Sequence, residues 1–159
     1  GASLCFEADA IFKLGGDCPF FDVEIANEAI SIWKDSNFDF VSNTINRTFP
    51  DGYDVGVMSI SALSRAFVLA RMPLEREHTS LYVRKNPNLF QLFNIDTEEI
   101  FPAQLSVTLD TLEDYTFLCN LEKHLGNSGF FGLREVVQLV RENPDLLTEI
   151  QFVQRKGDS

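Results

Sequence analysis

Short apolar runs alternate with longer amphipathic stretches along the whole chain. The run at positions 10–14 is almost wholly apolar, which predicts a central strand of a parallel sheet. Further extended runs are predicted at positions 38–43, 54–58, 89–95 and 105–109. Because these runs alternate with helical stretches throughout, the pattern predicts an α/β domain with a largely parallel sheet.

The amphipathic stretches predict helices through the spacing of their apolar residues. Asp22 and Ser61 are the expected N-caps of two of them, and Thr111-Leu112-Glu113-Asp114 resembles a capping box. A helix through positions 77–85 should end before proline, and the last helix covers 133–143. The residues expected to face inward are Ala26, Ala29, Ile30 and Trp33; Leu63, Ala66, Phe67 and Ala70; Tyr115, Leu118, Leu121 and Leu125; and Val136, Val137 and Val140.

Composition is that of a globular protein, with 45% hydrophobic and 23% charged residues among 159. We expect one domain at positions 1–153 and a flexible tail at 154–159. The sequence shows no signal peptide and no apolar run of membrane-spanning length, so no membrane partner is expected. Cys5, Cys18 and Cys119 form no CxxC pair, which favours reduced thiols in a cytoplasmic protein.

The net charge of −11 weighs against a nucleic-acid partner, because neutralising phosphates requires clustered Lys and Arg. An anionic ligand would need a local basic pocket or a bound cation to screen the field of the protein. The charge therefore directs attention to acidic residues that could hold a cation.

Asp17 and Asp110 share one local setting, since each follows a predicted strand and precedes a predicted helix. In open α/β sheets, ligands bind outside the carboxyl ends of the strands, so both carboxylates would face one crevice. Two carboxylates together with ligand phosphate oxygens suit Mg²⁺. The alternative is structural: Asp17 forms a turn, and Asp110 or Thr111 caps a helix.

Six motifs occur in order over nearly the whole chain. They are Gly16-Asp17-Cys18-Pro19, Asp39-Phe40-Val41-Ser42-Asn43-Thr44, Pro50-Asp51-Gly52-Tyr53-Asp54-Val55, Glu75-Arg76-Glu77-His78, Tyr82-Val83-Arg84-Lys85-Asn86-Pro87 and Leu109-Asp110-Thr111-Leu112-Glu113-Asp114-Tyr115. Together they closely resemble the cytidylyltransferase family of bacterial spore-coat polysaccharide biosynthesis proteins. That family is similar to the synthetases that make CMP-activated acidic sugars.

The resemblance implies a partial nucleotide-diphospho-sugar-transferase-like (Rossmann-like) three-layer fold with a mostly parallel sheet. It implies Mg²⁺-dependent transfer of a cytidylyl group from CTP to a sugar hydroxyl, with release of pyrophosphate. Asp17 and Asp110 would hold the metal by this analogy. Four residues would lie near the sugar pocket or a subunit contact, although a turn and a helix-end salt-bridge cluster would also explain them: Asp51, Asp54, Arg76 and His78.

The sequence departs from the family pattern in three places. It begins after the family's amino-terminal third, where a basic, glycine-containing loop would hold the triphosphate, and Gly15-Gly16 lacks the basic partner needed to replace that loop. Gly56 stands where the family carries an acid, and Leu112 replaces a common proline. We therefore expect the isolated chain to be inactive or incomplete, and a homodimer to cover the sheet edge. The alternative is a non-catalytic remnant that binds a sugar, a metal or another protein.

Overall fold

The computed structural model describes residues 6–78, 80–126 and 131–150. The tail expected at 154–159 lies outside these residues, as does Cys5. The chain forms two compact units. Unit 1 comprises residues 1–14, 24–48 and 54–97, and unit 2 comprises residues 15–23, 49–53 and 98–159.

Unit 1 contains a mixed sheet whose described strands are β1 (Ala10–Lys13), β2 (Phe40–Ser42), β3 (Gly56–Ser59) and β4 (Leu92–Asn94). The strand order is β1-β3-β2-β4. Strand β3 is antiparallel to both β1 and β2, and only β2 and β4 are parallel. The α/β class is confirmed, but the prediction of a mostly parallel sheet is wrong for these strands.

The first predicted strand is present, but β1 lies at an edge of the described sheet and is not central. Ala10 and Ile11 are half-buried, whereas Phe12 and Lys13 are exposed. An apolar run predicts that a strand is buried against other residues. It does not predict which strands lie beside it or whether they are parallel to it. The apolar run therefore predicted the strand correctly but not its place in the sheet.

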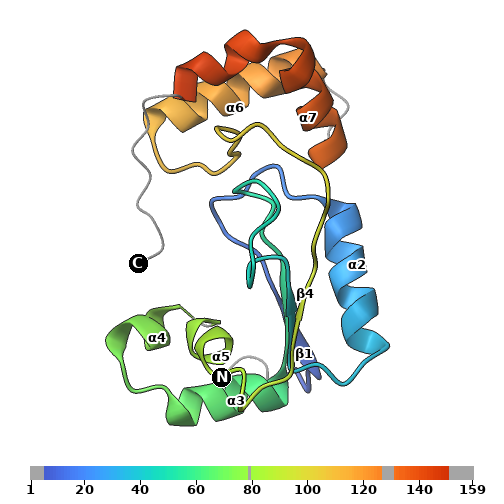
Figure 1. Ribbon diagram of the computed structural model, residues 1–159. Helices are drawn as coiled ribbons and strands as arrows, with labels where there is room; N and C mark the ends of the chain where they lie inside the picture. The colour runs from blue at the N-terminus through green and yellow to red at the C-terminus, as the bar shows by residue number, and fades with distance from the viewer. Residues whose placement is uncertain (1–5, 79, 127–130, 151–159) are drawn as a thin grey trace. The chain divides into compact units, whose positions relative to one another are not determined.

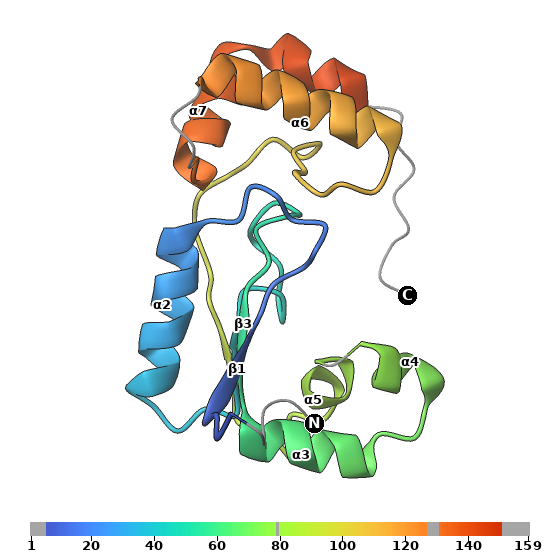
Figure 2. The same ribbon diagram turned by 180° about the vertical axis from the view of Figure 1, so that it is seen from behind.

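Helices cover the sheet of unit 1: α2 (Val23–Lys34), α3 (Ile60–Leu69), α4 (Pro73–Glu77) and α5 (Leu81–Lys85). Figures 1 and 2 show α2 along one side of the strands and α4 and α5 on the other. Unit 1 thus has the three layers expected from the sequence. One buried cluster joins the sheet to α3 and α5; it consists of Phe40, Met58, Ala62, Ala66, Val83 and Phe90.

Helix α3 begins two residues earlier than predicted. Ser59, not Ser61, is its N-cap, and the Ser59 Oγ accepts a hydrogen bond from the Ala62 N–H at 3.0 Å. The buried stripe is centred on Ala62 and Ala66, which turns Phe67 about 100° away from the core. Phe67 is 70% exposed, so its predicted inward position is wrong. The helix predicted at 77–85 is two short helices, α4 and α5.

Unit 2 is built on α6 (Leu112–Leu125), α7 (Leu133–Glu142) and the 3-10 helix η1 (Pro144–Ile150), which pack against one another. Helix α7 buries the predicted valines at 136, 137 and 140. Helix α6 buries Phe117, Leu118 and Leu121 but exposes Tyr115, contrary to prediction. The strand predicted at 105–109 forms only an isolated parallel bridge between Asp51 and Ser106. None of the described helices is long and apolar enough to cross a bilayer.

Candidate functional site

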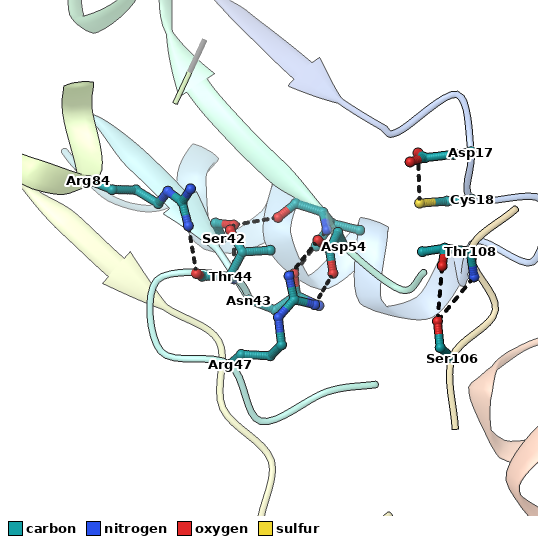
Figure 3. A network of polar contacts seen from close by, with 11 residues as sticks. Asp17, Cys18, Ser42, Asn43, Thr44, Arg47, Asp54, Arg84, Ser106 and Thr108 are labelled. Carbon is teal, nitrogen blue, oxygen red and sulfur yellow. Dashed lines mark hydrogen bonds and ion pairs between the residues drawn. The ribbon is translucent and has the colours of Figure 1, made fainter. Parts of the chain in front are cut away.

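The loop that carries Asp17 begins with a tight turn at Gly15. The Cys18 N–H donates to the Gly15 carbonyl at 3.4 Å, which closes a tight turn. A side chain at Gly15 would collide with the Asp17 carboxylate and would lie 2.8 Å from the Cys18 sulfur. The Asp17 carboxylate is exposed, and its contact with the Cys18 thiol is long, at 3.5 Å (Figure 3). The turn therefore presents Asp17 to solvent.

The extended segment before Asp110 joins two of the predicted acidic residues through the backbone. The Leu109 N–H donates to the Asp17 carbonyl at 2.8 Å, and the Val107 N–H donates to the Asp51 carbonyl at 2.9 Å. Alternate residues of an extended segment present their N–H groups on the same edge, about 6.6 Å apart. Asp17, Asp51 and Asp110 therefore belong to one backbone arrangement within unit 2.

Gly52 allows the Asp51 turn to approach this segment closely. Its φ is +97°, a conformation that favours glycine, and a Cβ there would lie 2.7 Å from the Val107 carbonyl carbon. The close approach is compatible with the hydrogen bond that Asp51 accepts from Val107. The turn signal at Pro50-Asp51-Gly52 is thus confirmed as a turn.

The Asp110 side of the site is shaped by a buried neighbour, Asp114, which is 1% exposed. One oxygen of Asp114 accepts the Thr111 N–H at 2.9 Å and the Asp110 N–H at 3.2 Å. The Thr111 hydroxyl also donates to that oxygen and accepts the Asp114 N–H, which completes the predicted capping box. These bonds fix the backbone from which the exposed Asp110 side chain projects.

A second buried carboxylate, Asp22, secures the Asp17 loop to helix α7. Its Oδ2 accepts a hydrogen bond from the Leu133 N–H at 2.7 Å, at the first residue of that helix. Tyr53 is fully buried in the same unit. Burial raises the pKa of the Tyr53 hydroxyl above its ordinary value of 10.0, and the charges of Asp22 and Glu135 raise it further. The Tyr53 hydroxyl is therefore buried in its neutral form.

The other predicted sugar-side residues, Asp54, Arg76 and His78, belong to unit 1. Asp54 forms a two-pronged ion pair with Arg47, with N–O distances of 2.6 and 2.9 Å (Figure 3). The Arg76 guanidinium lies over the Phe67 ring, 5.3 Å from its centroid. The backbone of exposed His78 closes the end of α4 on the Leu74 carbonyl at 3.0 Å.

Neither Asp17 nor Asp110 forms an ion pair with any residue that the structure describes. The surrounding sequence is acidic: unit 2 carries 14 of the 24 acidic residues and 5 of the 13 basic residues, and thus nine of the eleven net negative charges. The described residues contain no group of three or more His, Cys, Asp or Glu side chains placed to enclose a metal. The arrangement presents two exposed carboxylates on loops that one backbone hydrogen bond joins.

A pocket of about 480 Å³ lies within unit 2, and its walls begin next to the two aspartates. Pro19 and Leu109 line it, two residues after Asp17 and one residue before Asp110. Its larger walls come from four aromatic rings together with Leu118, Cys119 and Glu122. The rings are those of Phe20, Phe21, Tyr115 and Phe131.

Sequence reasoning missed this pocket and the roles of Asp22 and Asp114 as anchors of the two loops. The capping-box pattern identified Asp114 as a helix-start residue, but it did not predict the bond from the Asp110 N–H. The pocket joins a loop near residue 20 to α6 and Phe131, so no local pattern reveals it. Tyr115 was assigned to the core by spacing, but it lines the pocket.

Comparison with known proteins gives a consistent relationship. No family model matches the chain. It is 27% identical over 157 residues to the uncharacterized protein MJ1063 of Methanocaldococcus jannaschii, covering 98% of this chain and 63% of that protein. It is 30% identical over 141 residues to the spore coat polysaccharide biosynthesis protein SpsF of Bacillus subtilis, covering 87% and 58%.

A solved cytidylyltransferase from Leptospira borgpetersenii serovar Hardjo-bovis has the same fold, with a TM-score of 0.85 and 28% identity. The match covers 98% of this chain and 64% of that one. The chain thus spans about three fifths of the length of the proteins it matches. The chain is therefore related in sequence and in fold to a cytidylyltransferase, and in sequence to the spore coat polysaccharide biosynthesis protein SpsF.

Proposed function

We propose that the chain provides the metal- and sugar-binding part of a cytidylyltransferase that activates a sugar for polysaccharide biosynthesis. The observation that supports this most is the setting of Asp17 and Asp110. Both carboxylates are exposed and form no ion pair within the described residues, and the Leu109 amide links their loops at 2.8 Å. Two unpaired carboxylates in the more acidic unit favour the binding of a cation.

The donor set fits Mg²⁺ better than a metal that requires a closed protein site. Mg²⁺ takes one or two carboxylates, keeps several waters and accepts substrate phosphate oxygens. We assign Asp17 and Asp110 as its protein ligands. When bound, the ion would neutralise negative charge at the phosphate group that is transferred. Asp22 and Asp114 would act as positioning residues, because they hold the two loops that carry the ligands.

The proposed substrates are CTP and a sugar with a free hydroxyl. The sugar oxygen would bond to the α-phosphorus of CTP, the bond from that phosphorus to the pyrophosphate would break, and the hydroxyl proton would leave to solvent. Asp51 is the best placed of the four predicted sugar-side residues, because its backbone flanks the segment that carries Asp110. For Asp54, Arg76 and His78 the sugar-side role stays a prediction.

Pyrophosphate release from CTP tests the enzymatic part of this proposal. Any release should require Mg²⁺ and should disappear in Asp17→Asn but persist in Glu142→Gln, which changes an exposed acid of α7. Turnover that survives in Asp17→Asn would contradict the metal assignment. An absence of turnover together with an absence of any CTP-dependent thermal shift would favour a non-catalytic binding module.

We also propose a homodimer formed through unit 1. Helix α3 and the turn after it expose Phe67, Val68 and Met72, which are 70%, 61% and 62% exposed. Unit 1 carries only two of the eleven net negative charges, so two copies can approach there with less repulsion than through unit 2. Sedimentation equilibrium should give a dimer for the wild type and a monomer for Phe67→Ser with Met72→Ser. A wild-type monomer would contradict the proposal.

A further inference from the structure

We propose that the aromatic pocket of unit 2 receives an uncharged, apolar substituent of the sugar, such as the methyl group of a deoxy sugar or an N-acyl group. The proposal rests on the proposed function, because it assigns the pocket to the sugar substrate. It adds the substrate class, which neither the resemblance nor the related proteins specify.

The pocket begins beside the loops of Asp17 and Asp110. Pro19 and Leu109 form part of its wall, and these residues follow Asp17 by two and precede Asp110 by one. A sugar whose reacting hydroxyl lies at these carboxylates must extend its remaining ring atoms away from them. The pocket adjoins the same two loops within unit 2, so such a sugar can extend into it.

The walls of the pocket are largely apolar. The Phe20 and Phe131 rings stack with their centroids 6.3 Å apart, and Phe21, Tyr115 and Leu118 add further apolar surface. The volume of about 480 Å³ lies within the range of small-molecule sites. Polar side-chain groups on the walls are few. A side-chain hydrogen bond with the Cys119 thiol raises the pKa of the Tyr115 hydroxyl, so Tyr115 adds no charge at pH 7.

The charge on the described walls of the pocket is negative. The described lining residues include no Lys, Arg or His, and Glu122 is their only charged side chain. A carboxylate placed here would lose its hydration and meet a like charge. An acid group of the sugar must therefore lie outside the pocket. A hydroxyl buried there would lose its hydrogen bonds to water, which costs free energy. Burial of a methyl group is favourable, because it removes apolar surface from water.

Three sugars that differ only at C6 test this selectivity: 6-deoxyglucose, glucose and glucuronic acid. The readout is the rate at which iodoacetamide alkylates Cys119, followed by peptide mass spectrometry, without CTP or metal. We expect 6-deoxyglucose to protect Cys119 at roughly tenfold lower concentration than glucose. Glucuronic acid should give no protection. Equal protection by all three, strongest protection by glucuronic acid, or none by 6-deoxyglucose would overturn the proposal.

A charge reversal makes the test sharper. Glu122→Lys should allow glucuronic acid to protect Cys119, because the pocket then offers a cation. Glu142→Lys is the matched control, since it makes the same charge change at an exposed position of α7 in the same unit, and Glu142 does not line the pocket. It should leave the order of the three sugars unchanged. Each variant is compared with itself without sugar, because a lysine near Cys119 alters the basal alkylation rate.

The two proposals can fail separately, because this assay contains neither CTP nor metal. Selective protection without Mg²⁺ binding at Asp17 and Asp110 would support the pocket and remove the metal site. Mg²⁺ binding that depends on both aspartates, with no selectivity among the three sugars, would overturn the pocket alone.

Discussion

In unit 1, two carboxylates, those of Asp39 and Asp54, are paired with arginines. Asp39 lies 2.7 Å from Arg65, and Asp54 lies 2.6 Å from Arg47. Asp39 also accepts the Gln91 N–H at 3.0 Å, so its charge helps to join segments of the sheet region. These carboxylates have basic partners within their own unit.

In unit 2, Glu99 also pairs with an arginine, Arg141, at 3.1 Å, but the four aspartates in and beside the two site loops have other surroundings. Asp22 and Asp114 are buried and accept N–H groups at or near helix starts, whereas Asp17 and Asp110 are exposed and form no ion pair within the described residues. The role of an aspartate therefore depends on its surroundings more than on its place in a motif. A carboxylate is available to a cation where neither an arginine nor a helix start already binds it.

The largest effect on stability should come from the close backbone approach in unit 2. Gly52→Ala places a Cβ against Val107 at a residue whose φ is +97°. We expect the free energy of unfolding to fall by about 3 kcal/mol, measured by urea denaturation. Gly16→Ala is the control, because a Cβ there meets no atom within 4 Å. Equal effects of the two substitutions would show that the Asp51 turn does not depend on this approach.

The buried helix-start carboxylate should come next. Asp114→Ala removes the acceptor of the Asp110 and Thr111 N–H groups, and we expect a loss of about 2 kcal/mol in the free energy of unfolding. Glu113→Ala, at an exposed position of the same helical turn, should cost only a few tenths of a kcal/mol by comparison. If both variants unfold at the same urea concentration, the capping box does not support unit 2 as described.

The next effect is a loss of stability at alkaline pH that arises from Tyr53 in unit 2. Its folded pKa is raised above the unfolded value of 10.0, so its contribution to stability is complete below pH 10 and is lost as the pH rises further. We expect the wild type to lose up to about 1.4 kcal/mol per pH unit more than Tyr53→Phe above pH 10. Urea denaturation at several pH values measures both slopes. Parallel slopes would contradict the burial of neutral Tyr53.

The smallest effect should come from the exposed ion pair of unit 1. Asp54→Asn removes the charge that faces Arg47, but both side chains are about one third exposed, at 36% and 34%. We expect a change of less than about 1 kcal/mol in the free energy of unfolding, reduced further by salt. Arg47→Gln in the same background should add almost nothing. A larger, salt-independent loss would give Asp54 a structural importance that its exposure does not suggest.

The sequence predicted the type of most elements but not their pairing. Periodicity identified α2, α6 and α7, because each long helix repeats its apolar residues on one face. It placed β1 at the centre of the sheet and missed the antiparallel direction of β3, because strand order and direction depend on contacts between distant segments. It also placed Phe67 inward, because an apolar residue beside a buried stripe satisfies the same spacing.

For the site, the sequence placed Asp17 and Asp110 in similar loops, and the Leu109–Asp17 hydrogen bond brings those loops together. The reasoning assumed that both residues follow strands of one parallel sheet, which is not the arrangement found. The segment before Asp110 is extended but forms only the bridge at Ser106. The pocket was beyond prediction, because its walls depend on the docking of residues near 20 and 131 onto α6.

The central claim is that Asp17 and Asp110 together bind a divalent cation, and isothermal titration with Mg²⁺ tests it most directly. Substitution of residues that only position metal ligands weakens affinity about tenfold or more, so loss of a ligand should cost at least that much. We predict that Asp17→Asn and Asp110→Asn each weaken Mg²⁺ binding at least about tenfold, whereas Asp54→Asn leaves it unchanged. Binding that is the same in the wild type and in both site variants would contradict the account.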